Sequence, residues 1–197
     1  MTPLQPSIAL DDVLITEELH GRTARAPILT RQNDAFHGLA RTLSDPPQTI
    51  LQHILDVALE LTEAGSAGIS LIETGEDGTE VFRWVSMAGK LKDKVGHTSP
   101  REFSPCGVTL AMGEPQLFSL PGRFFDHYGE MEQPLHEGLV VPIFTSGRPC
   151  GTIWAVSHRD EGHFDMEDQR VMVSLAGFVG FAVKMLELIK RDAGAGA

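Results

Sequence analysis

Residues 138–158 read GLVVPIFTSGRPCGTIWAVSH, and this stretch decides the fold. Two β-rich runs, 139–144 and 151–157, lie on either side of a turn at 145–148. Val, Ile, Thr, Phe and Trp favour strands, and the Ser-Gly pair in the turn accepts the positive φ angles of a tight hairpin. Both runs are mostly apolar, which predicts strands covered on both faces of a sheet. Pro142 has no N–H to donate, so we expect a bulge or a free side on the first strand.

One helix and two strands are predicted before this hairpin. Residues 47–62 carry apolar side chains at helical spacing behind a Ser-Asp-Pro-Pro start, which indicates a helix. Residues 66–73 and 80–87 are rich in β-formers and are joined by a Gly-Glu-Asp-Gly turn. Ahead of them, a shorter helical pattern begins at Asn33, and two apolar islands near residues 8–15 could dock on the domain or stay mobile.

The segment 88–134 has no regular period. Glycines and prolines interrupt it, a helix start is visible at Ser104-Pro-Cys-Gly, and residues 116–120 resemble a short strand. The segment is too apolar for disorder, and a long irregular crossover inside a compact domain is usually functional.

A long amphipathic helix is predicted over residues 165–190, with Asp165 as its cap and acidic residues in its first turn. Its apolar side chains step by three and four residues, as in the seam of a coiled coil or bundle. The sequence therefore predicts a homodimer through this helix. The seam residues are Met172, Leu175, Val179, Ala182, Leu186 and Ile189.

Composition excludes several classes of partner. The chain has 197 residues, 42% of them hydrophobic, and a net charge of -11, which repels nucleic acid and anionic lipid. The N-terminus lacks a basic start followed by an apolar core, and no apolar run reaches the ~18 residues of a membrane helix. Two cysteines form no disulfide framework and fit a reducing compartment, so we expect a cytoplasmic protein.

The order helix, two strands, irregular crossover, hairpin and long helix resembles a GAF domain, in particular the N-terminal GAF modules of bacterial sensor histidine kinases, including their leader at 11–27. The stretches that carry the resemblance are SAGISLIE at 66–73, FRWVSMAG at 82–89, SPCG at 104–107, QLFS at 116–119, GRPCGTIWAVSH at 147–158 and FDMEDQRVMVSLAGFV at 164–179. The resemblance implies an α/β (α+β) fold with a six-stranded antiparallel sheet, terminal helices on one face, and a small-molecule pocket under the crossover on the other. We expect an N-terminal extension with a short helix at 1–44, the GAF domain at 45–190 and a disordered tail at 191–197.

The resemblance also implies a role in two-component signal transduction. No kinase phosphoacceptor or nucleotide-binding region follows the last helix, so we expect the output on a separate histidine kinase or other protein, or on a longer chain of which this is a fragment. The ligand is an unknown small molecule.

Aromatic residues of the crossover and the strands are the candidates for the pocket wall, with histidines for polar contacts. The alternative is that they are simply core between the sheet and the crossover, since large aromatics dominate cores. The predicted ligand-binding set is Trp84, Phe103, Cys106, Phe118, Phe124, His127, Tyr128 and Trp154.

Cys106 admits two interpretations. It occupies the second position of a predicted helix, where free N–H groups stabilise a thiolate, so a redox sensor or redox enzyme centred on Cys106 is one alternative function. The other interpretation is a small packed core residue, because unpaired cysteine is among the most buried residue types. A third overall hypothesis is a ligand-free interaction module with a filled core.

No catalytic constellation is recognisable, so the sequence does not predict an enzyme. GAF-type free methionine sulfoxide reductases use several cysteines, and this chain has two. The eight histidines have no metal-ligand spacing, and a haem-binding role for one of them is disfavoured. A covalent bilin is not expected, because the Cys-His pair and the Asp-x-Pro element of phytochrome-like GAF domains are missing. The identity of any cofactor stays open.

Overall fold

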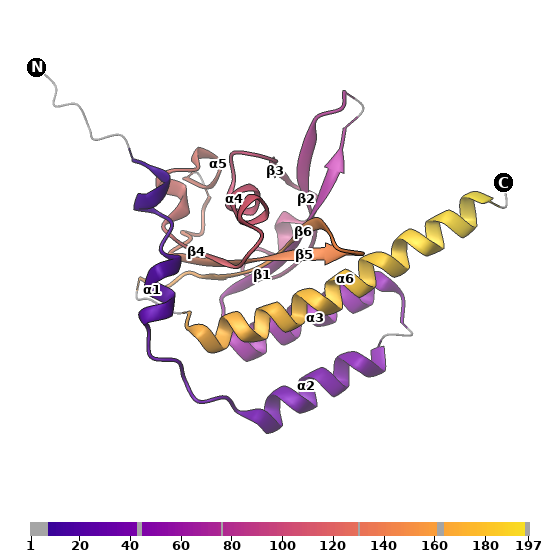
Figure 1. Ribbon diagram of the computed structural model, residues 1–197, viewed down its shortest axis with the longest axis horizontal. Helices are drawn as coiled ribbons and strands as arrows, with labels where there is room; N and C mark the ends of the chain where they lie inside the picture. The colour runs from indigo at the N-terminus through magenta and orange to yellow at the C-terminus, as the bar shows by residue number, and fades with distance from the viewer. Residues whose placement is uncertain (1–7, 43–44, 76, 130, 161–163, 196–197) are drawn as a thin grey trace, which may run out of the picture.

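A computed structural model describes residues 8–42, 45–75, 77–129, 131–160 and 164–195. Its centre is a six-stranded antiparallel sheet in the order β3-β2-β1-β6-β5-β4 (Figure 1). The strands are β1 Ser66–Thr74, β2 Glu80–Gly89, β3 Thr98–Pro100, β4 Gln116–Ser119, β5 Glu137–Thr145 and β6 Arg148–Ser157. The helices are α1 Thr16–Gly21, α2 Leu29–Arg41, α3 Pro47–Thr62, α4 Pro105–Met112, α5 Asp126–Gly129 and α6 Met166–Ala195. The predicted sheet is confirmed.

The β5–β6 hairpin turns through two residues with positive φ, Ser146 at 51° and Gly147 at 75°. Positive φ at both central residues is typical of a type I′ turn, whose twist matches that of the flanking strands. The ladder has an irregularity between Ile143 and Phe144, and β4 pairs with β5 only as far as Val140. Pro142 therefore lies beside a stretch of β5 that no described strand pairs on its outer side, as its missing N–H requires.

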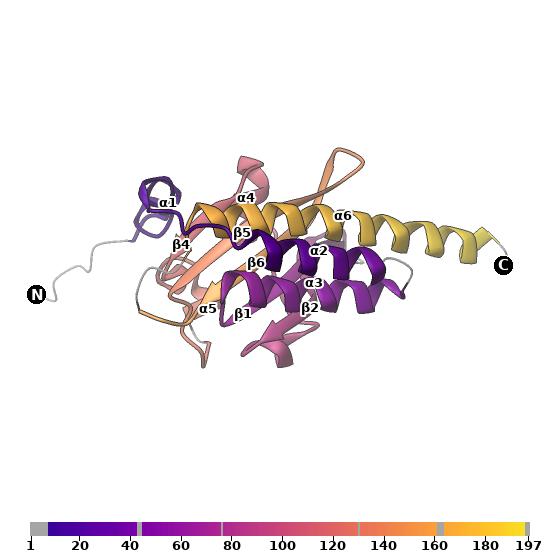
Figure 2. The same ribbon diagram turned by 90° about the horizontal axis from the view of Figure 1, so that it is seen from below.

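Helices α3 and α6 cover one face of the sheet, and α2 lies over them (Figure 2). The rings of Phe36 on α2 and Phe178 on α6 stack with centroids 5.9 Å apart. The start of α6 is capped by Asp165, whose Oδ1 accepts hydrogen bonds from the backbone N–H groups of Glu167 (2.7 Å) and Asp168 (3.1 Å). The cap predicted from the sequence is present.

Most of the expected seam of α6 belongs to the domain's own core; of its last two residues, Leu186 is half-buried and Ile189 is 52% exposed. Met172, Leu175, Val179 and Ala182 are fully buried between the helix and the sheet, so they are not available to a second copy. By length and composition the part of α6 from Met166 to Ile189 could cross a membrane, but this burial is that of a helix in the core of a domain. The helix also continues to Ala195, so residues 191–195 are helical where the sequence suggested a disordered tail.

The crossover packs on the opposite face as an ordered roof. It contributes α4, α5, 3-10 turns at Lys92–Lys94 and Pro121–Arg123, and the edge strand β3. A second buried cluster fills the space beneath it and includes Phe82, Trp84, Phe118 and Trp154. The sheet thus separates two cores, and only the crossover side is rich in aromatic residues.

The N-terminal residues dock on the domain. Leu14 forms a bridge with Phe118 at the outer edge of β4, and Val13 is fully buried in the crossover-side cluster. Leu19 on α1 is fully buried in the helical-side core. Of the two outcomes left open for this segment, the structure shows docking from Ile8 onward.

Candidate functional site

A cavity lies between the sheet and the crossover. The space open to the centre of a water molecule is about 40 Å³, enough for roughly three waters or a few organic atoms. Its floor is formed by side chains of β2, β4, β5 and β6, and its roof by α4 and residues 121–135. The cavity is therefore located where the resemblance implies a pocket.

Strand alternation explains why these side chains share the floor. Trp84 on β2 and Trp154 on β6 lie two strands apart, both opposite residues of β1, and their rings contact edge to face with centroids 6.0 Å apart. On β5, Gly138 and Val140 are two residues apart, so both face the same side. The Trp154 indole N–H donates to Ser70 Oγ at 3.0 Å, which fixes the orientation of the ring.

The roof depends on a capped helix. Ser104 Oγ accepts the backbone N–H of Gly107 at 3.1 Å and starts α4, which brings Cys106 over the sheet. Tyr128 stacks on Trp84 with centroids 6.2 Å apart, and His97 stacks on the same indole at 6.1 Å. The Trp84 indole is therefore held by ring contacts with His97 and with Tyr128 of the roof.

The lining is uncharged. Its residues are aliphatic, aromatic, proline, glycine and Cys106, with no Lys, Arg, Asp or Glu among them. Burial raises the pKa of the Cys106 thiol, although the hydroxyls of Thr152 and Ser70 oppose the shift. Burial also raises the pKa of the Tyr128 phenol. Both groups are therefore neutral at physiological pH, and the cavity contributes no charge to recognise an ion.

Five of the eight predicted ligand-binding residues line this cavity: Trp84, Cys106, Phe118, Tyr128 and Trp154. Phe103 is 47% exposed, and together with His127 it borders an open hollow beside β2 and β3 instead. Phe124 packs against Phe103 and Phe125, with centroids 5.2 and 4.9 Å apart. Phe103, Phe124 and His127 therefore do not line the cavity.

Sequence reasoning missed several lining residues. Val140 and Val156 share the facing of their strand neighbours, so the period-2 pattern of the hairpin could have identified them. The roof residues could not be found this way, because they belong to an aperiodic segment. The missed residues are Leu91, Pro105, Pro121, Met131, Leu135, Gly138, Val140 and Val156.

Within residues 8–42, 45–75, 77–129, 131–160 and 164–195, no three His, Cys, Asp or Glu side chains are grouped as metal ligands.

Comparison with known proteins agrees with this architecture. Structures similar to this chain include the GAF domain of a phosphoenolpyruvate-protein phosphotransferase from Coxiella burnetii (TM-score 0.68, 17% identity, covering 85% of this chain and 96% of that one). A free methionine-R-sulfoxide reductase from Neisseria meningitidis is similar at TM-score 0.64 and 19% identity, covering 83% and 94%. The GAF-B domain of DevS from Mycobacterium smegmatis is similar at TM-score 0.57 and 17% identity, covering 74% and 98%.

At these identities the similarities establish the fold and not the activity. No curated protein matches the chain in sequence. The sequence model of the GAF domain matches residues 44–184, which is most of the chain. GAF domains typically serve small-molecule sensing and signalling, and this chain belongs to the GAF domain family.

Proposed function

We propose that this chain is a sensory domain of bacterial signal transduction, which binds a small uncharged molecule in the cavity under the crossover and signals through α6. The observation that carries the proposal is a cavity with an uncharged, aromatic-rich lining at the centre of the roofed face. Such concave apolar sites are the usual places for small ligands.

The lining favours a neutral, largely apolar ligand. A buried ion without a charged partner costs several kcal/mol or more, and no lining side chain offers one. The available space of about 40 Å³ suits a molecule of a few heavy atoms without rearrangement. A larger ligand requires the roof around Met131 and Leu135 to move outward.

Signalling then takes the form of a population shift. A ligand that prefers one placement of the roof and β4 changes the relative populations of two conformations, by as much as its affinities for them differ. Helix α6 packs on β5 and β6, the strands that carry Val140 and Trp154 on their other face. We therefore expect α6 to transmit the ligand-dependent change in conformation.

The proposal includes a homodimer through the outer face of α6. Val173 and Phe181 are about half exposed, Leu188 is 41% exposed, and Gly177 has nothing within 4 Å of a Cβ built on it. These positions are spaced by three or four residues or multiples of them, so they form an apolar stripe along the helix. A stripe with a glycine near its centre lets an identical helix approach closely about a two-fold axis.

The cellular setting is also proposed. A net charge of -11 and two unpaired cysteines support a cytoplasmic protein that binds neither nucleic acid nor membranes. The resemblance to sensor-kinase GAF modules supports a histidine kinase or another output protein as partner in a two-component system.

A redox role centred on Cys106 is the weaker alternative. One structural neighbour is a methionine sulfoxide reductase, and such an activity needs a reactive thiolate. Burial raises the pKa of Cys106, which disfavours that thiolate.

Xenon occupancy and native mass spectrometry test the proposal. Xenon needs only apolar contacts, and we expect it to enter the wild-type cavity and to be excluded by Gly138→Ala, whose methyl group points into the cavity. Native mass spectrometry of freshly purified wild type is expected to show a co-purified small molecule that the variant loses. If neither xenon nor a small molecule occupies the wild type, the protein is an interaction module with a filled core.

A further inference from the structure

The N-terminal segment from Ile8 to Pro27, here called the strap, runs from the cavity side of the sheet to the start of α6. In Figures 1 and 2, α1 lies beside β4 and the first turns of α6. Val13 is buried in the crossover-side cluster and Leu19 in the helical-side core. One short segment therefore contacts both cores around the β4 edge of the sheet.

At its cavity end the strap completes the hydrogen bonding of β4. The N–H of Ile15 donates to the carbonyl of Leu117 at 2.8 Å, and the N–H of Ser119 donates to the carbonyl of Val13 at 2.8 Å. The Thr16 hydroxyl accepts the N–H of Leu117 at 3.0 Å and donates to Oε1 of Gln116 at 2.7 Å. Between these residues lies Phe118, which bridges Leu14 and lines the cavity. The cavity wall at β4 is thus held from outside by the strap.

At its other end the strap presents two arginines to buried carboxylates. Arg22 donates to both oxygens of Glu137 at 2.6 and 3.0 Å and to the carbonyl of Phe164 at 2.8 Å. Arg25 donates to both oxygens of Asp168 at 2.5 and 2.9 Å. Bidentate pairs of this kind combine charge with fixed geometry.

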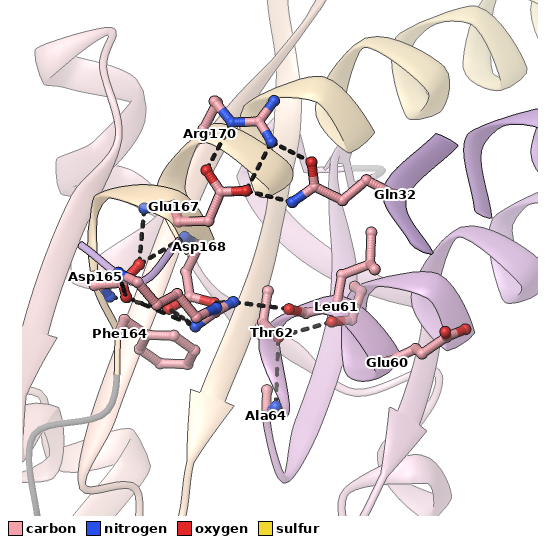
Figure 3. Close-up of polar contacts among 12 residues, drawn as sticks. Gln32, Glu60, Leu61, Thr62, Ala64, Phe164, Asp165, Glu167, Asp168 and Arg170 are labelled. Atoms are coloured by element: carbon pink, nitrogen blue, oxygen red, sulfur yellow. Dashed lines mark hydrogen bonds and ion pairs between the residues drawn. The ribbon is translucent and has the colours of Figure 1, made fainter. Parts of the chain in front are cut away.

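Arg25 also joins the strap to α3 and to the cap of α6. Its guanidinium donates to the carbonyl of Leu61 at 2.8 Å, and its backbone N–H donates to Oδ2 of Asp165 at 2.9 Å. Figure 3 shows Asp165 and Asp168 close together at the start of α6, with Leu61 of α3 nearby. The cap that starts α6 is therefore shared between α6 and the strap.

Burial of the two carboxylates makes the stability of the start of α6 depend on the docked strap. Asp168 is fully buried and Glu137 is 5% exposed. Burial raises the pKa of Asp168, against the hydrogen bonds from Arg25. Removing a partner from a buried ion pair is strongly destabilising, because the remaining charge is left uncompensated. The start of α6 is accordingly sensitive to whether the strap is docked.

We propose that the strap is a latch that couples the cavity to the start of α6: its pairing with β4 and its two arginine–carboxylate pairs, Arg22–Glu137 and Arg25–Asp168, here called the clamp, form and break as one unit. In the docked state the strap pairs with β4 and neutralises the carboxylates. In the released state both ends are lost together, because α1 links Ile15 to Arg22, and Arg22 and Arg25 both bond to residues 164–168 at the start of α6. A change at Phe118 thereby reaches Asp165 and Asp168. The latch rests on the proposed function for the ligand that moves Phe118 and β4, whereas the coupling of β4 to α6 does not require a ligand.

Hydrogen exchange of the full chain tests the latch. In Arg25→Gln, we expect exchange to become about tenfold faster or more at residues 13–19, at 116–119 and at 165–168 together, while β1 and β2 keep their wild-type rates. Arg31→Gln is the matched control, because Arg31 also pairs with a carboxylate, Glu60 at 3.0 Å, but on the exposed surface of α2 and α3. It should leave all three segments unchanged. Arg25→Lys keeps the positive charge but loses the bidentate hydrogen bonding to Asp168. It takes the place of Arg25→Gln in the experiment if that variant does not fold.

Gly138→Ala tests the cavity end of the latch. Its methyl group fills cavity space on the strand position paired with Phe118, and we expect slower exchange at residues 13–19 and 165–168 as well as at 116–119. Faster exchange in Arg25→Gln confined to 22–28 and 165–168, or an equal increase across the whole domain, would overturn the latch. If xenon does not enter the wild type while the three segments still open together in Arg25→Gln, the proposed function fails and the coupling stands.

Discussion

Gly68 lies directly against the indole of Trp154: a Cβ built on Gly68 would be 2.2 Å from Cζ2 of that ring. The two residues are paired across β1 and β6, so the missing side chain creates the space that lets the indole lie over the sheet. The hydrogen bond from Trp154 to Ser70 Oγ then holds the ring there.

Gly68→Ala is therefore expected to destabilise the protein by about 2 kcal/mol, the usual cost of overpacking a rigid core. The methyl group must displace the indole toward the cavity. Urea unfolding gives the change in stability, and the Trp fluorescence of the native state reports the displaced ring. An unchanged unfolding midpoint would show that the indole is free to move aside.

Gly138→Ala should have the opposite sign. The atom nearest to the position of its added methyl group is Cγ2 of Val156 at 4.0 Å, an ordinary contact, and the φ of Gly138 is not positive. Replacing glycine in a strand and burying one methyl group together should stabilise the protein by about 1 kcal/mol. Thermal unfolding should show a midpoint a few degrees higher. A lower midpoint would mean that the floor of the cavity is already filled.

The ring of His158 predicts a pH dependence of stability. Its Nδ1 lies 2.8 Å from the carbonyl oxygen of Pro134, which can only accept, so Nδ1 carries the hydrogen and Nε2 accepts from the Ser66 hydroxyl at 2.8 Å. Burial lowers the pKa of His158 below its usual value of 6.5. The unfolded chain therefore binds more protons between that lowered pKa and about 6.5, and stability falls as the pH drops through this window.

Unfolding free energies at pH 7.5 and 5.5 check this dependence. The difference between the two pH values should be smaller in His158→Gln than in the wild type, since glutamine does not titrate. The same difference in both proteins would assign the pH dependence to other groups.

The thiols offer a test of the redox alternative. In Cys150→Ser, which keeps Cys106, reaction of the native protein with a disulfide reagent should be at least about a hundredfold slower than after denaturation, because the thiol is buried and its pKa is raised. Cys106→Ser, which keeps the half-buried Cys150, is the matched comparison. Rapid reaction of native Cys106 at pH 7 would favour the redox function over ligand sensing.

The apolar stripe of α6 predicts dimer-breaking substitutions. Phe181→Glu should convert the dimer to monomer in sedimentation velocity runs, because it places a charge in an apolar helix interface. Val95→Glu introduces the same charge at a residue that is 51% exposed elsewhere and should leave the dimer intact. A wild type that sediments as a monomer at high concentration would contradict the proposed interface.

The sheet was predictable because its main strands carry their own signals. β5 and β6 are long, rich in β-formers and joined by a Ser-Gly turn, and β1 and β2 follow the same logic. β3 was missed because three residues ending in proline, Thr98–Pro100, are too short to show a period. Helix α2 begins at Leu29, four residues earlier than the pattern at Asn33 indicates.

The candidate site was only partly predictable from the sequence. Trp84 and Trp154 have facings fixed by alternation, whereas nothing local distinguishes Tyr128, which faces the cavity, from Phe103, which does not. The clamp was beyond local reasoning altogether. Arg22 and Glu137 are 115 residues apart, and Arg25 and Asp168 are 143 apart, so only the folded chain shows that they pair.

The strap has a practical consequence for anyone who prepares a shortened version of this protein. The family match begins at residue 44, which invites a fragment cut there. Such a fragment would lack Ile15 and Val13 along β4, and Arg25 beside Asp168. An unpaired strand edge is prone to self-association, and a buried Asp168 without its arginine partner destabilises the start of α6. A recombinant fragment should therefore start upstream of Ile8 if it is to remain dispersed in solution.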